Sequence, residues 1–380
     1  MKIALLGTTL FRQGSEYVLT VLARELSKRG HDVTVILSKI YDDWRKAHPD
    51  WKPFDLGDKV HVAVLPARRI RANVFPLRKI FVKNRFDVVL EHAGQLRIPM
   101  LVGGALMRKG PVLIHVEHLW VGVDSKGIRI EPRKTLWGRL YNWILRHLDA
   151  QFVVSEGTAD ALVRMTGYSR ERIYTVYNPV VDDVFERKRQ ETPTHPWLRE
   201  AAIPVVVAAG AFIPVKNYEL LLRAWAKVVK KYKARLVIFG EGDLRGEYEK
   251  LIGELNIGDS VSLPGFTDNL PAELKKASGF VVSSYVESFS VVLVEALASG
   301  IPVVSTDCPY GPGEILQRGR YGILVKNNDV MALANGIMKV LDGTGIRPSP
   351  ESYAPFMVDT VVERYLSAIK DVLSKRELKL

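Results

Sequence analysis

The chain has 380 residues, of which 47% are hydrophobic and 25% are charged, and its formal net charge is +12. This composition predicts a folded protein of about two domains and excludes a disordered chain. The single cysteine, Cys308, excludes an internal disulfide framework and a zinc site built on cysteines. No apolar run approaches the ~20 residues that a membrane-spanning helix needs. We therefore expect a cytoplasmic protein, either free or peripheral on a membrane.

The excess positive charge lies in the first half of the chain. Residues 1–180 contain 29 basic and 17 acidic residues, whereas residues 181–380 contain 25 of each. Such an asymmetry predicts an anionic partner for the first half, either a membrane surface or a nucleic acid. No RNA-binding module pattern and no aromatic stacking platform accompanies the charge, so no nucleic acid is expected.

Apolar runs and helical patterns alternate through residues 1–180. They predict strands at residues 2–6, 33–37, 60–65, 87–90, 112–116 and 151–155, with helices between, the first at residues 16–29. This alternation predicts an α/β domain with a parallel sheet. The loop of residues 7–15 ends in Gly14 and Ser15, where ligands of such sheets bind, although an ordinary turn would look the same. It matches neither the GxGxxG fingerprint nor a P-loop.

Two stretches of the first half combine basic residues with apolar or aromatic ones. Residues 68–85 hold seven basic residues and no acidic one, and residues 126–147 mix basic residues with tryptophan and tyrosine. This composition is typical of helices that lie on an anionic bilayer, although a solvated helix face over an ordinary core would also produce it. The candidate acceptor- or membrane-binding residues are Arg68, Arg69, Arg71, Arg78, Lys79, Trp137 and Trp143.

A second α/β series follows from residue 204. It predicts a buried strand at residues 204–210, a helix at 217–232, and a strand and glycine loop at 234–245. Glycines in that loop would let a ligand approach the backbone closely. Residues 186–200 indicate a polar surface excursion, residues 344–355 a linker and residues 358–378 a last helix.

Residues 280–305 predict a β–α–β unit, with strands at 280–284 and 302–305 and a helix at 289–299. The helix N-terminus near Ser288–Ser290 offers N–H groups that suit a diphosphate. Glu287 and Glu295 lie on either side of it. Glu295 interrupts an apolar helix, so it either pairs with a neighbouring group or accepts hydrogen bonds from the hydroxyls of a ligand.

A strand that ends at His115–His118 carries two histidines and Glu117. Their spacing places the two rings on opposite faces of a strand, which argues against a metal site.

The segment ESFSVVLVEALASGIPVV, in which seven residues separate Glu287 from Glu295, resembles the signature of the retaining GT-B glycosyltransferases of family 4. The resemblance implies two Rossmann-like parallel-sheet domains that face each other across a crevice, with a C-terminal helix that crosses back to the first domain. It places an acceptor-binding domain at residues 1–178, with the helix at about 357–380, and a donor-binding domain at residues 179–356.

The same resemblance implies roles for single residues. Glu287 would contact the donor sugar, Glu295 the ribose and Lys216 the diphosphate, and His118 would lie near the sugar. Ala211 stands where the family pattern has an Arg, and Arg12 is one candidate to replace that cation. The catalytic candidates are Glu287, His118 and Lys216. The donor-binding candidates are Glu295, Ser288, Phe289, Ser290, Val291, Gly210, Gly240, Gly242, Phe266, Gly14 and Ser15.

The implied function is transfer of a sugar, Gal, GalNAc or GlcNAc, from a UDP-sugar to a glycan or lipid-linked acceptor at the cytoplasmic face of the membrane, in the synthesis of surface glycans. No metal and no cofactor besides the nucleotide sugar is implied. The sequence GPGE at residues 311–314 resembles members that use UDP-sugars, and a GDP-mannose-dependent mannosyltransferase is an alternative. A UDP-sugar 2-epimerase conflicts with the spacing of the glutamates, whereas Ala211 favours a non-catalytic nucleotide-sugar-binding protein.

Overall fold

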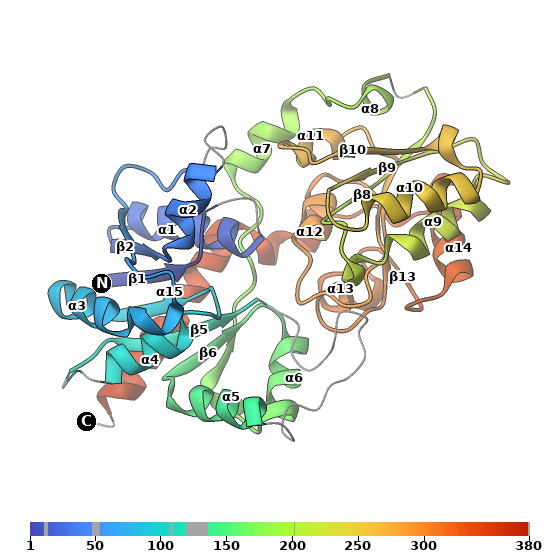
Figure 1. Ribbon diagram of the computed structural model, residues 1–380. Coiled ribbons are helices and arrows are strands. Elements are labelled where there is room, and N and C mark those ends of the chain that lie inside the picture. Colours follow the sequence, from blue (N-terminus) through green and yellow to red (C-terminus); the bar gives the residue numbers. More distant parts are fainter. Residues whose placement is uncertain are drawn as a thin grey trace. The chain divides into compact units, whose positions relative to one another are not determined.

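The computed structural model describes residues 1–10, 14–47, 54–105, 107, 109–118, 136–200 and 202–378, with side chains for all of these except residues 44, 45, 47 and 136–141. The chain divides into two compact units (Figure 1). Unit 1 contains the described residues of 1–118, 136–179 and 358–378. Unit 2 contains the described residues of 180–357.

Each unit is built on a parallel sheet, as the sequence predicts. Within the described ranges, the strand order is β3-β2-β1-β4-β5-β6-β7 in unit 1 and β10-β9-β8-β11-β12-β13 in unit 2. In both sheets the winding reverses beside the first strand, and ligands of open parallel sheets bind at such a point. The strands of unit 1 are β1 (Lys2–Gly7), β2 (Asp32–Leu37), β3 (His61–Val64), β4 (Val88–Glu91), β5 (Val112–Glu117), β6 (Ala150–Val153) and β7 (Ile173–Thr175). Those of unit 2 are β8 (Val205–Ala209), β9 (Arg235–Phe239), β10 (Val261–Gly265), β11 (Gly279–Val282), β12 (Val303–Thr306) and β13 (Ile323–Val325).

Helices cover the sheets and bury their own apolar faces against them. The helices of unit 1 are α1 (Gly14–Lys28), α2 (Ile40–Ala47), α3 (Val74–Asn84), α4 (Arg97–Ala105), α5 (Leu136–His147), α6 (Glu156–Thr166) and α15 (Val358–Glu377), with the 3-10 turns η1 (Ile70–Asn73) and η3 (Arg170–Arg172). The helices of unit 2 are α7 (Asp183–Gln190), α8 (Pro196–Glu200), α9 (Tyr218–Val228), α10 (Arg245–Glu254), α11 (Leu270–Leu274), α12 (Val291–Ala298), α13 (Gly311–Ile315) and α14 (Val330–Leu341). Its 3-10 turns are η4 (Pro214–Lys216), η5 (Gly258–Ser260), η6 (Gln317–Gly319), η7 (Pro350–Ser352) and η8 (Ala354–Phe356).

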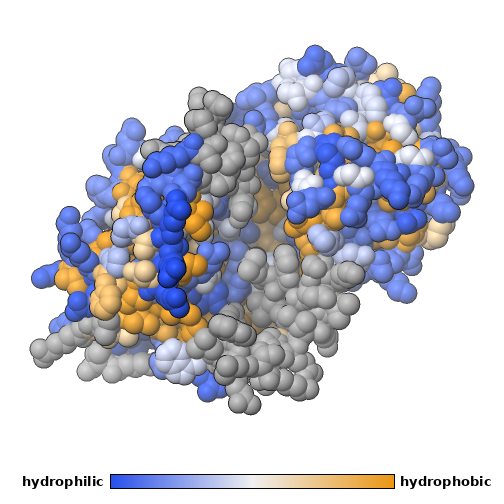
Figure 2. All heavy atoms as spheres, viewed as in Figure 1, coloured by the Kyte–Doolittle hydropathy of each residue, from blue (hydrophilic) through white to orange (hydrophobic). Residues whose placement is uncertain are grey.

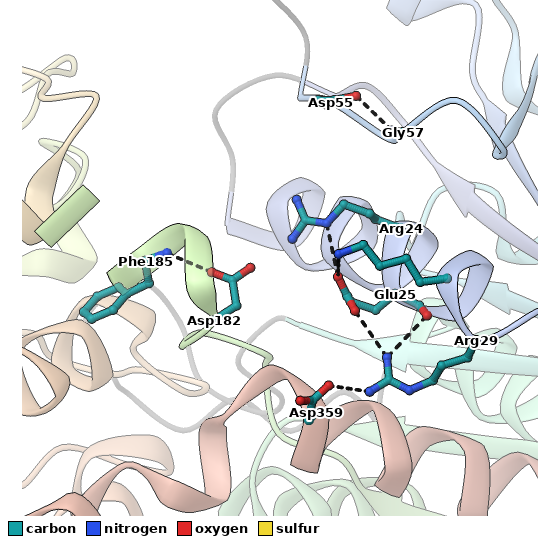
Figure 3. A network of polar contacts seen from close by, with 9 residues as sticks. Arg24, Glu25, Arg29, Asp55, Gly57, Asp182, Phe185 and Asp359 are labelled. Atoms are coloured by element: carbon teal, nitrogen blue, oxygen red, sulfur yellow. Dashed lines mark hydrogen bonds and ion pairs between the residues drawn. The ribbon is translucent and has the colours of Figure 1, made fainter. Parts of the chain in front are cut away.

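The last helix, α15, completes the core of unit 1, which agrees with the predicted return of the C-terminal helix to the first domain. Its residues Val361, Tyr365 and Ile369 are fully buried in the cluster that also contains the apolar faces of α1 and the sheet. Charged groups join the two helices at the surface. Arg29, directly after α1, contacts Glu25 of α1 at 3.3 Å and Asp359 of α15 at 2.5 Å (Figure 3).

Several predicted boundaries are wrong, and a capping side chain accounts for one of them, the start of α7. Gly14 and Ser15 form the first turn of α1 rather than the end of a loop. Residues 186–200 are not a plain surface excursion, because they include residues 186–190 of α7 and all of α8. Asp182 caps the start of α7, where its Oδ1 accepts a hydrogen bond from the backbone N–H of Phe185 at 2.8 Å (Figure 3). The buried carboxylate of Glu273 binds the chain before α8 by accepting a hydrogen bond from the backbone N–H of Thr194 at 2.8 Å. Residues 344–355 contain η7 in addition to linker.

Candidate functional site

The loop between β11 and α12 in unit 2 carries Glu287. Glu287 is 9% exposed. Its Oε1 accepts a hydrogen bond from Ser284 Oγ at 2.7 Å and lies 2.6 Å from Lys216 Nζ. A charge removed from water is costly unless it is paired, and each of these two groups neutralises the other. The two residues to which the sequence assigned different parts of a ligand therefore contact each other directly.

Backbone contacts hold this loop against two others. Gly311 N donates to Glu287 O at 2.9 Å, and Tyr285 N donates to Val215 O at 2.8 Å. A Cβ atom on Gly311 would lie 2.1 Å from the carbonyl oxygen of Phe289, so only glycine permits this approach. Loops that follow β8, β11 and β12 consequently meet at the ion pair, at the carboxyl ends of their strands, where parallel sheets bind ligands.

The helix after this loop begins at Val291, two residues later than predicted. Its N-cap, Ser290, has a left-handed backbone (φ 89°), which breaks the helix, and its buried Oγ has no partner within the described residues. Ser288 is buried, and the Phe289 ring packs edge-on against Phe356 at 5.3 Å, so the side chain of Phe289 belongs to the core. The positive end of α12 starts at Val291, next to Ser290.

Three glycines that the sequence assigned to a ligand have a reason within the fold. A Cβ atom on Gly240 would lie 2.0 Å from Gly210 O, and one on Gly242 would lie 2.7 Å from Phe212 O. Gly210 itself has a φ of 150°. The chain segments at residues 210–212 and 240–242 thus approach each other closely, and this contact requires glycine whether or not a ligand binds.

Other predicted donor-binding residues are accessible. Gly14 is exposed, and an added Cβ atom would meet nothing within 4 Å, so the fold does not require glycine there. Ser15 is half-buried. Phe266, directly after β10, is 53% exposed. These residues are free to contact a ligand.

Glu295 lies half-buried on α12, about one turn after Val291. Burial raises the pKa of its carboxyl to about 7, and the positive charge of Lys188 on α7 opposes part of the rise. Within the described residues the carboxyl has no hydrogen-bond donor. Donors on a ligand would favour its charged form and lower the pKa.

In unit 1, two Glu–His pairs end neighbouring strands. Glu91 is the last residue of β4 and is followed by His92, while Glu117 is the last residue of β5 and is followed by His118. The two histidine rings stack at 5.2 Å, and His92 Nδ1 lies 2.9 Å from His118 Nε2. His118 was predicted from the sequence and His92 was not, although the repeated Glu–His dipeptide at the ends of two strands was a visible signal.

A buried ionic cluster lies beneath these rings. His115 Nδ1 is 2.6 Å from Glu91 Oε2, and its Nε2 is 3.3 Å from Glu117 Oε2. The guanidinium of Arg97 lies 3.9 and 3.8 Å from the same two carboxylates. Burial and Arg97 lower the pKa of His115, but the two carboxylates raise it by more. In the described part of the chain, no group of three or more His, Cys, Asp or Glu side chains is arranged to hold a metal ion.

Burial also lowers the pKa of the two stacked rings, and there its effect prevails. It lowers the pKa of His118 to about 4, although Glu117 opposes the change, and it lowers the pKa of His92 well below its usual value, with further contributions from His118 and His115. Both rings are therefore uncharged at neutral pH.

The basic residues predicted to face an acceptor or a membrane are exposed just before η1, in η1 and on α3. Arg68 pairs with Asp43 at 2.9 Å, whereas Arg78 and Lys79 lie on the outer face of α3 with the exposed Phe75 and Val82. Arg69 and Arg71 are also exposed. Figure 2 shows a hydrophobic area on unit 1 next to a ridge of strongly hydrophilic residues.

Helix α5 contributes Trp143, which is 52% exposed and lies 4.3 Å from the His147 ring. The side chain of Trp137 and residue Arg12 lie outside the described residues. Among the described helices, none has both the length and the apolar character needed to cross a bilayer.

Comparisons with known proteins agree with this arrangement. The model of Glycosyltransferase Family 4 matches residues 12–184, and the model of Glycosyl transferases group 1 matches residues 197–355. An uncharacterized glycosyltransferase of Methanocaldococcus jannaschii is 36% identical over 316 residues, which cover 75% of each chain. An N-acetylgalactosamine-N,N'-diacetylbacillosaminyl-diphospho-undecaprenol 4-alpha-N-acetylgalactosaminyltransferase of Campylobacter jejuni is 31% identical over 200 residues, 53% of each chain.

The fold is that of the GT-B glycosyltransferases. The crystal structure of Anabaena HepE in complex with UDP superimposes with a TM-score of 0.77 at 18% identity, covering 98% of this chain and all of the other. The chain belongs to glycosyltransferase family 4, a family of transferases, as its sequence predicts. It spans only 24% and 53% of the length of two of the curated relatives that it matches.

Proposed function

We propose that this chain transfers a hexose or N-acetylhexosamine from a UDP-sugar to an acceptor hydroxyl and retains the anomeric configuration. The contact between Lys216 and Glu287, beside the N-terminal end of α12, carries the proposal. A departing nucleoside diphosphate develops negative charge, which an ammonium group and a helix N-terminus stabilise. Unit 2 then binds the donor, and unit 1 binds the acceptor.

The ligand-free ion pair suggests how the site responds to its donor. A diphosphate competes with Glu287 for Lys216, because it carries more charge than one carboxylate. Glu287, once released, accepts hydrogen bonds from the hydroxyls of the sugar, and Ser284 still holds its Oε1. Glu295 accepts hydrogen bonds from the ribose.

UDP is our choice of nucleotide, because the HepE structure contains UDP and the name of the Campylobacter relative specifies an N-acetylgalactosaminyl group. A screen of UDP-, GDP- and ADP-sugars by thermal unfolding tests it, since a ligand at 100 times its Kd stabilises the native state by about 2.7 kcal/mol. Stabilisation by GDP-mannose alone would favour a mannosyltransferase. A product formed from a UDP-sugar without acceptor would indicate an epimerase, and binding without any turnover a non-catalytic protein.

We further propose that the acceptor is a glycan or a lipid-linked diphosphate glycan and that unit 1 meets it at the inner face of the cell membrane. The outer face of α3 alternates bulky apolar residues, Phe75 and Val82, with Arg78 and Lys79. Helix α4 packs on α3 and also contacts α5, which carries Trp143 (Figure 1). Basic residues beside exposed aromatic ones bind anionic lipid surfaces.

Reversing two charges on α3 should release the protein from anionic vesicles. Each basic residue near an anionic surface contributes about 1 kcal/mol, so Arg78→Glu with Lys79→Glu should weaken binding at low salt by roughly 30-fold or more. Co-sedimentation with vesicles of phosphatidylglycerol and phosphatidylcholine measures this. The matched control is Lys227→Glu with Lys230→Glu, the same charge change at exposed positions of unit 2. Equal loss in both variants would contradict a role for α3.

Donor binding should also depend on pH through Glu295. Hydrogen bonds from the ligand favour the carboxylate, so binding expels a proton from a group whose pKa is about 7 in the free protein. The affinity for UDP-glucose, whose phosphates do not titrate in this range, should therefore rise with pH up to about 7 and then level off. Calorimetry in buffers of different ionisation enthalpy counts the proton released.

The variant Glu295→Gln should bind UDP-glucose with no such pH dependence. It should also flatten the pH dependence of unfolding. The native carboxyl, with its raised pKa, binds more protons than the unfolded one between pH 4.5 and about 7, so stability falls as pH rises through this window. If stability still falls with rising pH in the Glu295→Gln variant, Glu295 is excluded as the source of this pH dependence.

A further inference from the structure

The facing nitrogens of His92 and His118 share a single proton. At 2.9 Å one nitrogen must donate and the other accept, because two N–H groups or two lone pairs would repel each other. Both rings are uncharged at neutral pH, as their lowered pKa values indicate. Each ring then carries one N–H, and the contact uses one of the two.

The far nitrogen of His92 decides which ring donates. His92 is 6% exposed, and its buried Nε2 has no partner within the described residues. If His92 accepted at Nδ1, its own N–H would be at this isolated Nε2. Buried N–H groups without an acceptor are rarer than acceptors that lack a donor. Donation from His92 Nδ1 to His118 Nε2 avoids the less favourable arrangement.

The two strand ends hold the rings in register. His115 lies between Glu91 and Glu117, the residues directly before His92 and His118. The ends of β4 and β5 are therefore joined twice, by the contact of His92 with His118 and by the contacts of His115 with both glutamates. Arg97 and His115 both contact Oε2 of each carboxylate, which ties the two glutamates to the same pair of cationic or proton-donating groups.

We propose that His92 is a positioning residue that holds His118 in the tautomer protonated at Nδ1. His118 then meets the ligand as a neutral hydrogen-bond donor. Its Nε2 lone pair is already occupied, so it does not take the proton from an acceptor hydroxyl. The atom that it recognises is an oxygen with a free lone pair, such as a hydroxyl or ring oxygen of a sugar. This role for His118 rests on the proposed transferase function.

The tautomer can be measured in the ligand-free protein, independently of any substrate. With ring-15N-labelled histidine, and with the His118 signals assigned by their loss in His118→Ala, long-range 1H–15N spectra at neutral pH should show His118 protonated at Nδ1 and unprotonated at Nε2. His92→Phe keeps an aromatic ring but removes the donor, and should shift His118 toward the Nε2–H form that free histidine prefers. His92→Asn, whose amide N–H replaces Nδ1–H, should preserve the Nδ1–H form.

Equal midpoints of thermal unfolding for the two His92 variants establish that both are folded. A wild-type His118 that is protonated at Nε2, or a tautomer unchanged in a folded His92→Phe variant, would overturn the proposal.

Transfer assays test the consequence for the ligand. His92→Phe should lower kcat/KM about 10-fold and His92→Asn less than about 3-fold, as expected for one weakened hydrogen bond. His118→Asn, whose amide nitrogen replaces Nδ1, should likewise retain more activity than His118→Gln, whose amide nitrogen replaces Nε2. If the tautomer is confirmed but kcat/KM is equal for the two His92 variants and equal for the two His118 variants, the donor role of His118 is overturned. Absence of transfer in the wild type would refute the proposed function and leave the spectroscopic result unaffected.

Discussion

Replacing Glu287 by glutamine is expected to lower kcat/KM for sugar transfer at least ~100-fold, because one preorganised polar contact at a reacting centre has about this effect. The amide keeps the shape of the side chain and can still accept from Ser284 Oγ. It cannot neutralise Lys216, which is left without the carboxylate that lies 2.6 Å away in the ligand-free protein. Binding of UDP should therefore be unchanged or tighter in Glu287→Gln.

Lys216→Met provides the contrasting variant. It removes the ammonium group, so both transfer and UDP binding should fall. Isothermal calorimetry with UDP separates the two variants, and single-turnover kinetics measures the chemical step. Weaker UDP binding in Glu287→Gln would contradict competition between the carboxylate and the diphosphate. Normal turnover in either variant would exclude the pair from catalysis.

Gly311→Ala is expected to destabilise unit 2 by about 3 kcal/mol or more, which is the upper range for overpacking a tightly packed site. The new Cβ atom would lie 2.1 Å from the carbonyl oxygen of Phe289 and 2.6 Å from its Cα, and neither backbone atom can rotate away. The loop that carries Glu287 must shift, so UDP-sugar affinity should also fall. Urea unfolding and thermal shift with ligand measure the two effects.

The control for Gly311 is Gly246→Ala on α10. No atom lies within 4 Å of a Cβ atom at that position, which is in the first turn of α10, and alanine is a better helix former than glycine. This variant should be as stable as the wild type or more so. Equal stability of the two variants would show that the loop yields easily around Gly311.

The alternation of apolar runs with helical patterns predicted the parallel sheets, because their buried strands are continuous apolar runs such as Val205–Ala209. The start of α12 was misplaced because a left-handed backbone at Ser290 interrupts an otherwise helical pattern. The hydrophobic pattern does not encode this conformation, which is unfavourable for a residue other than glycine. Likewise, α7 is charged along most of its length, so its N-cap, Asp182, was its main signal.

The composition of the candidate site was easier to predict than its internal contacts. The spacing of Glu287 and Glu295 predicted a donor site in this part of the chain, but the ion pair with Lys216 joins residues 71 positions apart. The partnership of His92 with His118 likewise depends on which strands are neighbours in the sheet. A pattern along the chain does not contain that information.

The position of α15 also affects the order in which the protein can be completed during synthesis. Unit 2 has all of its described residues once residue 357 has been made, whereas unit 1 still lacks Val361, Tyr365 and Ile369 of its core. A growing chain can thus complete its second unit before its first. Until the final helix emerges from the ribosome, the apolar surface that α15 will cover is available to chaperones, and a premature stop in this helix would damage the N-terminal unit.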